Sequence, residues 1–240
     1  MIHIQLERVA SGFGRKPVLR DLSLTVEPGT VYALLGGQGS GKSAVIDILA
    51  GNRRADGGRA IVLGVSAWAS GPRHASPVAV ITGGGRVNPW LTARQLARFT
   101  AGSAAVWDHA LADDIAARLE LPMDVPLREL PEGAQVCAEL IAAAGRCAPV
   151  VLLDEPTAGM DAGMRQRFLD VLPVVARECR SAVLVASAFT DVAAVADRGG
   201  LLEGGRIAQD ISRMEMRLGA MHGFVEDAGV HLPTYATAAA

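Results

Sequence analysis

Short apolar runs separated by glycine-rich turns set the pattern of this chain, and they predict strands that alternate with helices. Apolar and polar residues alternate along residues 2–9 and 18–26, which predicts two N-terminal strands. A Glu-Pro-Gly turn then leads into the apolar run at 31–35, which predicts a buried strand. We expect further short strands at 61–63, 78–81, 150–153, 182–186 and 200–202.

Helical patterns fill the spaces between these strands. The spacing of apolar residues predicts helices at 44–50, 92–100, 109–121, 136–147, 164–178 and 191–196. Between residues 89 and 147 the chain is mainly helical, which predicts a short helical lobe inserted between two strands. The wholly apolar run at 150–153 is typical of a strand that is buried on both faces of a parallel sheet.

One glycine-rich segment carries the strongest chemical signal. Residues 36–43 read GGQGSGKS, which fits the phosphate-loop pattern G-x-x-x-x-G-K-[ST], between a predicted strand and a predicted helix. Backbone N–H groups of such a loop and the helix N-terminus attract phosphate. Lys42 would reach the β- and γ-phosphates and Ser43 would hold Mg²⁺. A chance match in a glycine-rich turn is disfavoured by the register of strand, loop and helix. The predicted nucleotide contacts of this segment are Gly36, Gly37, Gln38, Gly39, Ser40, Gly41, Lys42, Ser43 and Ala44.

A pair of carboxylates follows the apolar strand at 150–153. Such a strand delivers Asp154 and Glu155 at the carboxyl edge of the sheet, where nucleotides bind. Asp154 would hold Mg²⁺ through its water shell, and Glu155 would act as general base on the attacking water. A turn with two solvated acids is the alternative, but it explains neither the upstream phosphate loop nor the continuation PTAGMD.

With both motifs in place, the chain resembles the ATP-binding subunit of an ABC transporter over residues 2–210. LLGGQGSGKS corresponds to Walker A, and VVLLDEPTAGMD corresponds to Walker B and the D-loop. By this resemblance Phe13 is the aromatic that stacks on adenine, and Asp161 is the D-loop aspartate. The short lobe and the stretches VYALLG and LTARQLARF are most similar to the drug and ABC-2 type exporter subgroup.

The resemblance implies an α/β fold with a P-loop NTPase core and a mostly parallel sheet. An antiparallel N-terminal β-subdomain and the inserted lobe at 89–147 would complete a domain at 1–212, followed by a tail at 213–240. The family implies a head-to-tail dimer, here a homodimer or a pair with a related ATP-binding chain, that sandwiches two ATP molecules. It also implies a multi-span membrane permease as partner, and a cytoplasmic location on the inner face of the membrane.

The signature motif departs from the family pattern. Leu-Ser-Gly-Gly-Gln is replaced by LPEGA at residues 130–134. Pro131 stands where the family places the serine that meets the γ-phosphate, and it has no N–H to donate. Glu132 would repel a triphosphate. The same residues suit a helix start at 130–133, which is the interpretation that we favour.

Two further family residues are missing. Ser187 stands at the position of the switch histidine, and it offers no titratable imidazole. The Q-loop glutamine, expected near 82–84, is absent because no glutamine lies between Gln38 and Gln95. Sequence therefore predicts Mg-ATP binding with weak hydrolysis in a subunit that couples ATP to an exporter. The alternative is a non-hydrolysing, ATP-responsive regulatory or structural subunit of a membrane complex.

Composition narrows the class of protein. The 240 residues carry a net charge of −2, which argues against nucleic-acid binding through a broad basic face. Three cysteines without metal-ligand spacing are expected to be reduced structural thiols. Neither a signal peptide nor an apolar run of membrane-spanning length is expected. Trp68, Trp90 and Trp107 are candidate contacts for a permease, although packing within the core or lobe is favoured.

Overall fold

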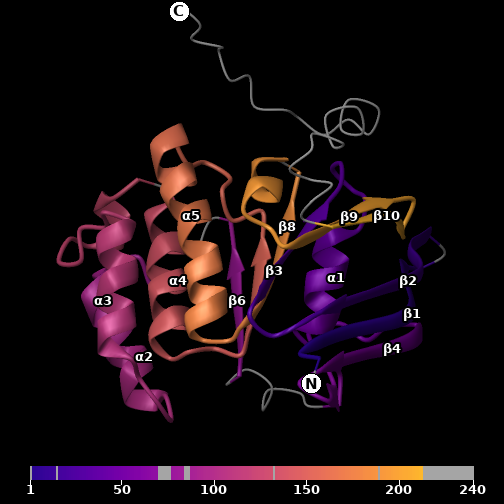
Figure 1. Ribbon diagram of the computed structural model, residues 1–240, viewed down its shortest axis with the longest axis horizontal. Coiled ribbons are helices and arrows are strands. Elements are labelled where there is room, and N and C mark those ends of the chain that lie inside the picture. The colour runs from indigo at the N-terminus through magenta and orange to yellow at the C-terminus, as the bar shows by residue number, and fades with distance from the viewer. Residues whose placement is uncertain are drawn as a thin grey trace, which may run out of the picture.

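The computed structural model describes residues 2–14, 16–69, 77–83, 87–131, 133–188 and 190–212. The tail predicted at 213–240 lies outside the described residues. Two sheets and a group of helices make up the described chain, in an α/β arrangement (Figure 1).

The N-terminal sheet is antiparallel and has the strand order β2-β1-β4-β5. Alternation places Ile4 and Leu6 inward, and a register shift between Leu6 and Val9 turns Val9 inward as well; each is almost wholly buried. The predicted strands are confirmed, but β5 was not anticipated because two residues are too few for a pattern. The bounds are Ile4–Phe13 for β1, Lys16–Val26 for β2, Gly57–Val62 for β4 and Val65–Ser66 for β5.

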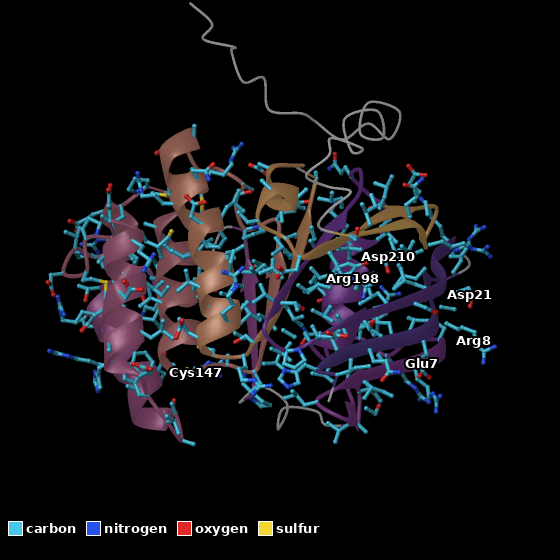
Figure 2. All side chains as sticks on the ribbon, viewed as in Figure 1. Glu7, Arg8, Asp21, Cys147, Arg198 and Asp210 are labelled. Atoms are coloured by element: carbon cyan, nitrogen blue, oxygen red, sulfur yellow. The ribbon has the colours of Figure 1, made fainter. Side chains whose placement is uncertain are left out.

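The central sheet has the order β10-β9-β3-β8-β7-β6 and is parallel except for β10. Sequence reasoning missed β10, whose residues are mostly polar or exposed; an ion pair of 2.6 Å between Arg198 and Asp210 joins it to β9 (Figure 2). The bounds are Thr30–Leu35 for β3, Val78–Thr82 for β6, Val150–Asp154 for β7, Ala182–Ser187 for β8, Arg198–Glu203 for β9 and Arg206–Ser212 for β10.

Apolar cores lie on both faces of the central sheet. Alternate residues of β3 divide between them: Val31, Ala33 and Leu35 face one core, and Tyr32 and Leu34 face the other. Helix α1 lies between the two sheets, whereas α2, α3, α4 and α5 cover the other face (Figure 1). The bounds are Lys42–Leu49 for α1, Ala93–Ser103 for α2, His109–Arg118 for α3, Ala134–Gly145 for α4 and Ala162–Glu178 for α5.

The helix predicted to start at 130–133 starts later. Leu130 is extended, with φ −98° and ψ 162°, and α4 begins at Ala134 with Gly133 as its N-cap residue. Proline disfavours helical geometry in the residue before it, and Pro131 therefore delays the helix. A short 3₁₀ helix at Leu127–Glu129 precedes this segment and was not predicted.

The helix predicted at 191–196 is a 3₁₀ helix at Thr190–Ala194. The chain must return to β3 almost at once, because the N–H of Asp197 donates to the Val31 carbonyl and the Asp197 carboxylate accepts from the Val31 N–H. That return leaves room for only a tight helical turn. No helix in the described part of the chain is long and apolar enough to cross a membrane.

Candidate functional site

The phosphate loop connects β3 to α1, as predicted. Gly41, with φ 112°, is the N-cap residue of α1, and its carbonyl accepts a hydrogen bond from the Val45 N–H. A Cβ at Gly41 would lie 2.8 Å from a Leu19 methyl carbon, and one at Gly36 would lie 2.7 Å from the Leu202 carbonyl oxygen. Gly41 therefore requires glycine for both backbone conformation and space, and Gly36 requires it for space.

Lys42 closes the loop on itself. Its side chain is 6% exposed, and its Nζ donates to the carbonyl oxygens of Gly36 at 2.7 Å and Gly37 at 3.1 Å. The same Nζ lies 3.2 Å from Oε1 of Glu155. The loop lysine and the carboxylate after β7, which are far apart in the sequence, therefore form an ion pair.

Glu155 is fixed by the ends of two strands. Its backbone has φ 46°, and its N–H donates to the Ala186 carbonyl at 2.8 Å. Its Oε2 accepts a hydrogen bond of 3.1 Å from the backbone N–H of Ala188. The side chain remains 32% exposed, so water reaches the carboxylate that sequence reasoning assigned as the base.

Asp154 lies at the carboxyl end of β7, between Thr82 of β6 and Ala186 of β8 in the sheet register. Burial raises the pKa of its carboxyl above the usual range, and a hydrogen bond with Ser43 acts in the opposite direction. Among the described residues, Oδ1 of Asp154 is buried without a hydrogen-bond partner. A buried carboxylate oxygen beside a serine hydroxyl fits Mg²⁺, which prefers hard oxygen ligands.

An open cavity of about 730 Å³ lies above the loop. It is lined by Val18, Gln38, Gly39, Gly41, Lys42, Ser43, Ala44, Asp47, Glu155, Ala158 and Ala188. Six of these, 38, 39 and 41–44, are predicted loop contacts, whereas Gly36 and Gly37 act through Lys42 and Ser40 lies outside the lining. Sequence reasoning missed Val18 and Asp47. Asp47 follows Ser43 by one helical turn, which is a signal that could have found it.

A second opening of about 370 Å³ adjoins the first and is lined by Ser43, Thr82, Gly83, Asp154, Glu155, Ala158 and Gly159. Thr82 and Gly83 belong to the predicted Q-loop position, and the rest of that segment, at 84–86, lies outside the described residues. Gly83 donates its N–H to the Asp154 carbonyl at 2.9 Å. At this position the contact between the end of β6 and the end of β7 is therefore a backbone hydrogen bond, with no glutamine side chain.

One predicted contact does not meet the others. Asp161 is the N-cap residue of α5, where its carboxylate accepts from the Met164 N–H at 2.8 Å, and it lines neither opening. The side chain of Phe13 lies outside the described residues.

The altered signature segment lies against the start of α5. Leu130 packs on the core and Pro131 is exposed, whereas Glu132 lies outside the described residues. Gly133 is buried, and a Cβ there would lie 2.5 Å from Cγ of Met160. Ser187, at the switch-histidine position, is fully buried at the end of β8.

Comparison with known proteins agrees with this geometry. The family model described as ABC transporter matches residues 19–158, more than half of the chain. The chain belongs to the ABC transporter family. It is 32% identical over 218 residues to the aliphatic sulfonates import ATP-binding protein SsuB of Cupriavidus necator, covering 87% of this chain and 69% of the relative. It is 28% identical to the ABC transporter ATP-binding protein YtrB of Bacillus subtilis, covering 83% of this chain and 68% of that one.

Solved structures support the P-loop NTPase fold of this ABC chain. A dimeric ATP-binding cassette in a post-hydrolysis state, bound to ADP and Pi, superimposes with a TM-score of 0.74 at 18% identity. The match covers 88% of this chain and 98% of that structure. The ABC ATP-binding chain thus combines a family fold and phosphate loop with altered residues at three other family positions.

Proposed function

We propose that this ABC chain binds Mg-ATP in the 730 Å³ cavity and couples ATP binding to a membrane permease, with slow or absent hydrolysis. The observation that carries the proposal is the arrangement of Lys42, Ser43, Asp154 and Glu155 around two adjoining openings, which share Ser43 and Glu155. Each of these side chains has the chemistry that phosphate or Mg²⁺ requires.

Each of these residues has a role that follows from its position. Backbone N–H groups of the loop and the start of α1 would hold the phosphates, with Lys42 as the fixed cation. Ser43 and Asp154 would hold Mg²⁺, which when bound neutralises phosphate charge. In the described part of the chain, no cluster of three or more His, Cys, Asp or Glu could hold a metal ion. Phosphate and water would supply the remaining Mg²⁺ ligands. Glu155 would take the proton of the attacking water.

The altered residues support the slow turnover. The family uses the signature serine, the glutamine and the histidine to clamp and sense the γ-phosphate. In this chain the serine is replaced by Pro131 and the histidine by Ser187, and a glycine-rich segment after Thr82 stands in place of the glutamine. A second function follows from the same observation: an ATP-responsive subunit that stabilises a membrane complex without turnover.

Two kinds of partner belong to the proposal. One is a second copy or a related ATP-binding chain in a head-to-tail dimer, supported by the dimeric cassette that shares the fold. Asp161 would communicate with the opposite site, and Phe13 would stack on adenine. The other partner is a multi-span membrane permease, through which this chain would sit on the inner face of the membrane. These two partners complete the proposal.

The proposed direction of transport is export, and it rests on the short lobe and on the subgroup resemblance. The relatives include both the aliphatic sulfonates import ATP-binding protein and the Nod factor export ATP-binding protein I of Rhizobium etli.

The deciding experiment measures steady-state phosphate release and ATP affinity on the purified chain with Mg²⁺. It includes Glu155→Gln and the exposed control Glu178→Gln. We expect micromolar-range binding in all three proteins and little release in any. Rapid release that disappears only in Glu155→Gln would establish a working ATPase and contradict slow turnover. Failure of all three to bind would remove the nucleotide function itself.

A further inference from the structure

Two thiols meet at the ends of α4 and α5. The Sγ atoms of Cys147 and Cys179 are 3.0 Å apart, although 32 residues separate them in the sequence. Cys179 is the C-cap residue of α5, and Cys147 follows the last turn of α4. Figure 2 labels Cys147 near the lower ends of these helices. The proposed ATP function uses neither thiol.

The backbone holds both cysteines in place. Cys147 has φ 44°, and its N–H donates to the Ala144 carbonyl at 2.8 Å, whereas the Cys179 N–H donates to the Val175 carbonyl at 3.2 Å. A disulfide has an S–S length of about 2.05 Å, so the two sulfurs must approach each other by about 1 Å for the bond to close. Both residues are half-buried, which leaves a path for a small oxidant. Cys137 differs, because it is buried within α4.

We propose that Cys147 and Cys179 form a reversible disulfide when the chain meets a peroxide. In the first step the Cys147 sulfur attacks hydrogen peroxide; the O–O bond breaks, the sulfur is oxidised to a sulfenic acid and one water leaves. In the second step the Cys179 sulfur attacks that sulfenic sulfur; the S–S bond forms, the S–O bond breaks and a second water leaves. Two thiols and one peroxide thus give one disulfide and two waters, and a dithiol reductant reverses the change.

The order of the two steps follows from the surroundings of Cys179. The Cys179 thiol donates to the Ala144 carbonyl at 3.5 Å and to the Cys147 sulfur at 3.0 Å, and both contacts favour its protonated form. Burial, together with the adjacent Cys147 thiol, also raises the pKa of Cys179. Because the thiolate is the reactive form, Cys179 is the poorer group for the first attack on peroxide. Its role is to resolve the sulfenic acid at contact distance.

The position of the two cysteines determines which parts of the chain a disulfide would link. Cys147 and Cys179 lie just before β7 and β8, at the edge of the sheet opposite Asp154 and Ser187. The bond would close a loop that contains Asp154, Glu155 and the D-loop, and it would tie α4 of the lobe to α5 of the core. Neither thiol lines the nucleotide cavity, so oxidation leaves the phosphate loop open.

The test treats the reduced full-length chain with hydrogen peroxide and counts free thiols after denaturation. We expect the count to fall from three to one and to return to three with dithiothreitol. Trypsin should release peptide 147–165 linked to peptide 178–180, whereas Cys137 should stay free in peptide 129–146. The oxidised chain should unfold roughly 5–10 °C higher than the reduced chain, because the crosslink restricts the unfolded state.

Matched variants separate the outcomes. Cys137→Ser should still lose two thiols, whereas Cys147→Ser and Cys179→Ser should form no internal bond. The proposal is overturned if three free thiols remain after peroxide treatment or if the bond forms to Cys137 instead. A bond between two chains, or direct oxidation to sulfinic acid, would overturn it as well. Thiol counts and peptide maps do not depend on ATP, so they stand whether or not the chain binds nucleotide.

Discussion

The backbone N–H of Ala188 donates a hydrogen bond of 3.1 Å to Oε2 of Glu155, directly after the position that the family gives to its switch histidine. The other carboxylate oxygen of Glu155 lies 3.2 Å from Nζ of Lys42. The carboxylate is thus held from two sides, by a backbone N–H and by the ammonium group of Lys42. This arrangement fixes the carboxylate without an imidazole.

Lys42→Ala should remove the main cation of the phosphate loop. A charge-assisted hydrogen bond contributes about 1.5–3 kcal/mol, so we expect the dissociation constant for ATP to rise by about tenfold to a hundredfold. Calorimetric titration with Mg-ATP measures this change. The control is Lys16→Ala, the one other lysine, which is exposed on β2. Equal weakening by both substitutions would point to general electrostatics instead of a loop contact.

Asp154→Asn should change how stability depends on pH. Burial raises the pKa of Asp154, so the folded chain binds its proton more tightly than the unfolded chain does. The resulting stability is present below the usual carboxyl range and is lost as pH rises through the raised pKa. We expect the variant to melt about 1–3 °C higher than the parent at pH 8, with a difference that shrinks as pH falls to 4 and below.

Thermal unfolding across pH checks this, with exposed Asp170→Asn as the control. A variant that is less stable than the parent at pH 8 would contradict the sign. Mg-ATP should stabilise the parent more than Asp154→Asn, because the variant lacks the carboxylate that would hold the metal.

Repair of the signature tests which altered position limits turnover. The double substitution Pro131→Ser with Glu132→Gly restores a hydroxyl and an N–H and removes a negative charge. We expect phosphate release to rise about tenfold or more, since each well-placed donor to a transferring phosphoryl group contributes that much. Glu129→Ala, exposed and nearby, makes the same change in charge. If the double variant releases phosphate at an unchanged rate, the missing glutamine and histidine, and not the signature, limit turnover.

Gly145→Ala should destabilise the junction of α3 and α4. A Cβ at position 145 would lie 2.5 Å from Cζ2 of Trp107, and we expect a loss of about 1–3 kcal/mol in the free energy of unfolding. Gly102→Ala is the matched control, because no atom lies within 4 Å of its Cβ position and alanine favours the helix by about 0.5–1 kcal/mol. Urea unfolding should therefore move in opposite directions for the two variants.

Trp90→Ala should affect partner binding more than folding. Trp90 is 67% exposed, and the guanidinium carbon of Arg128 lies 3.6 Å from its ring centroid. Such a pair contributes at most about 1 kcal/mol at an exposed site. We expect nearly unchanged stability but reduced co-purification with the proposed multi-span permease. Phe99→Ala, at 77% exposure on α2, is the control, and an equal loss there would contradict a specific role for Trp90.

The three tryptophans divide in the structure. Trp107 packs partly buried against the core and the backbone of Gly145, as the favoured interpretation expected. Trp68 and Trp90 are half-exposed or more, which packing within the core does not explain. Side-chain type could not separate them, because exposure depends on which elements cover each position.

Local patterns determined much of this protein by themselves. Short-range spacing predicts the phosphate loop, the strand that leads into Asp154 and Glu155, and the five α-helices of the described residues. The geometry of a turn or a buried strand restricts which residues occupy it. The loss of the family glutamine and histidine is also a sequence fact, independent of the fold.

Tertiary structure alone decided what meets at each site. The strand order β9-β3-β8-β7-β6 brings Lys42, Glu155 and Ala188 together, and the crossings of α4 and α5 bring Cys147 to Cys179. The weakly patterned strands β5 and β10 exist because neighbouring strands supply their hydrogen bonds. Such contacts depend on sheet register and helix packing between distant segments, and no short window of sequence encodes either.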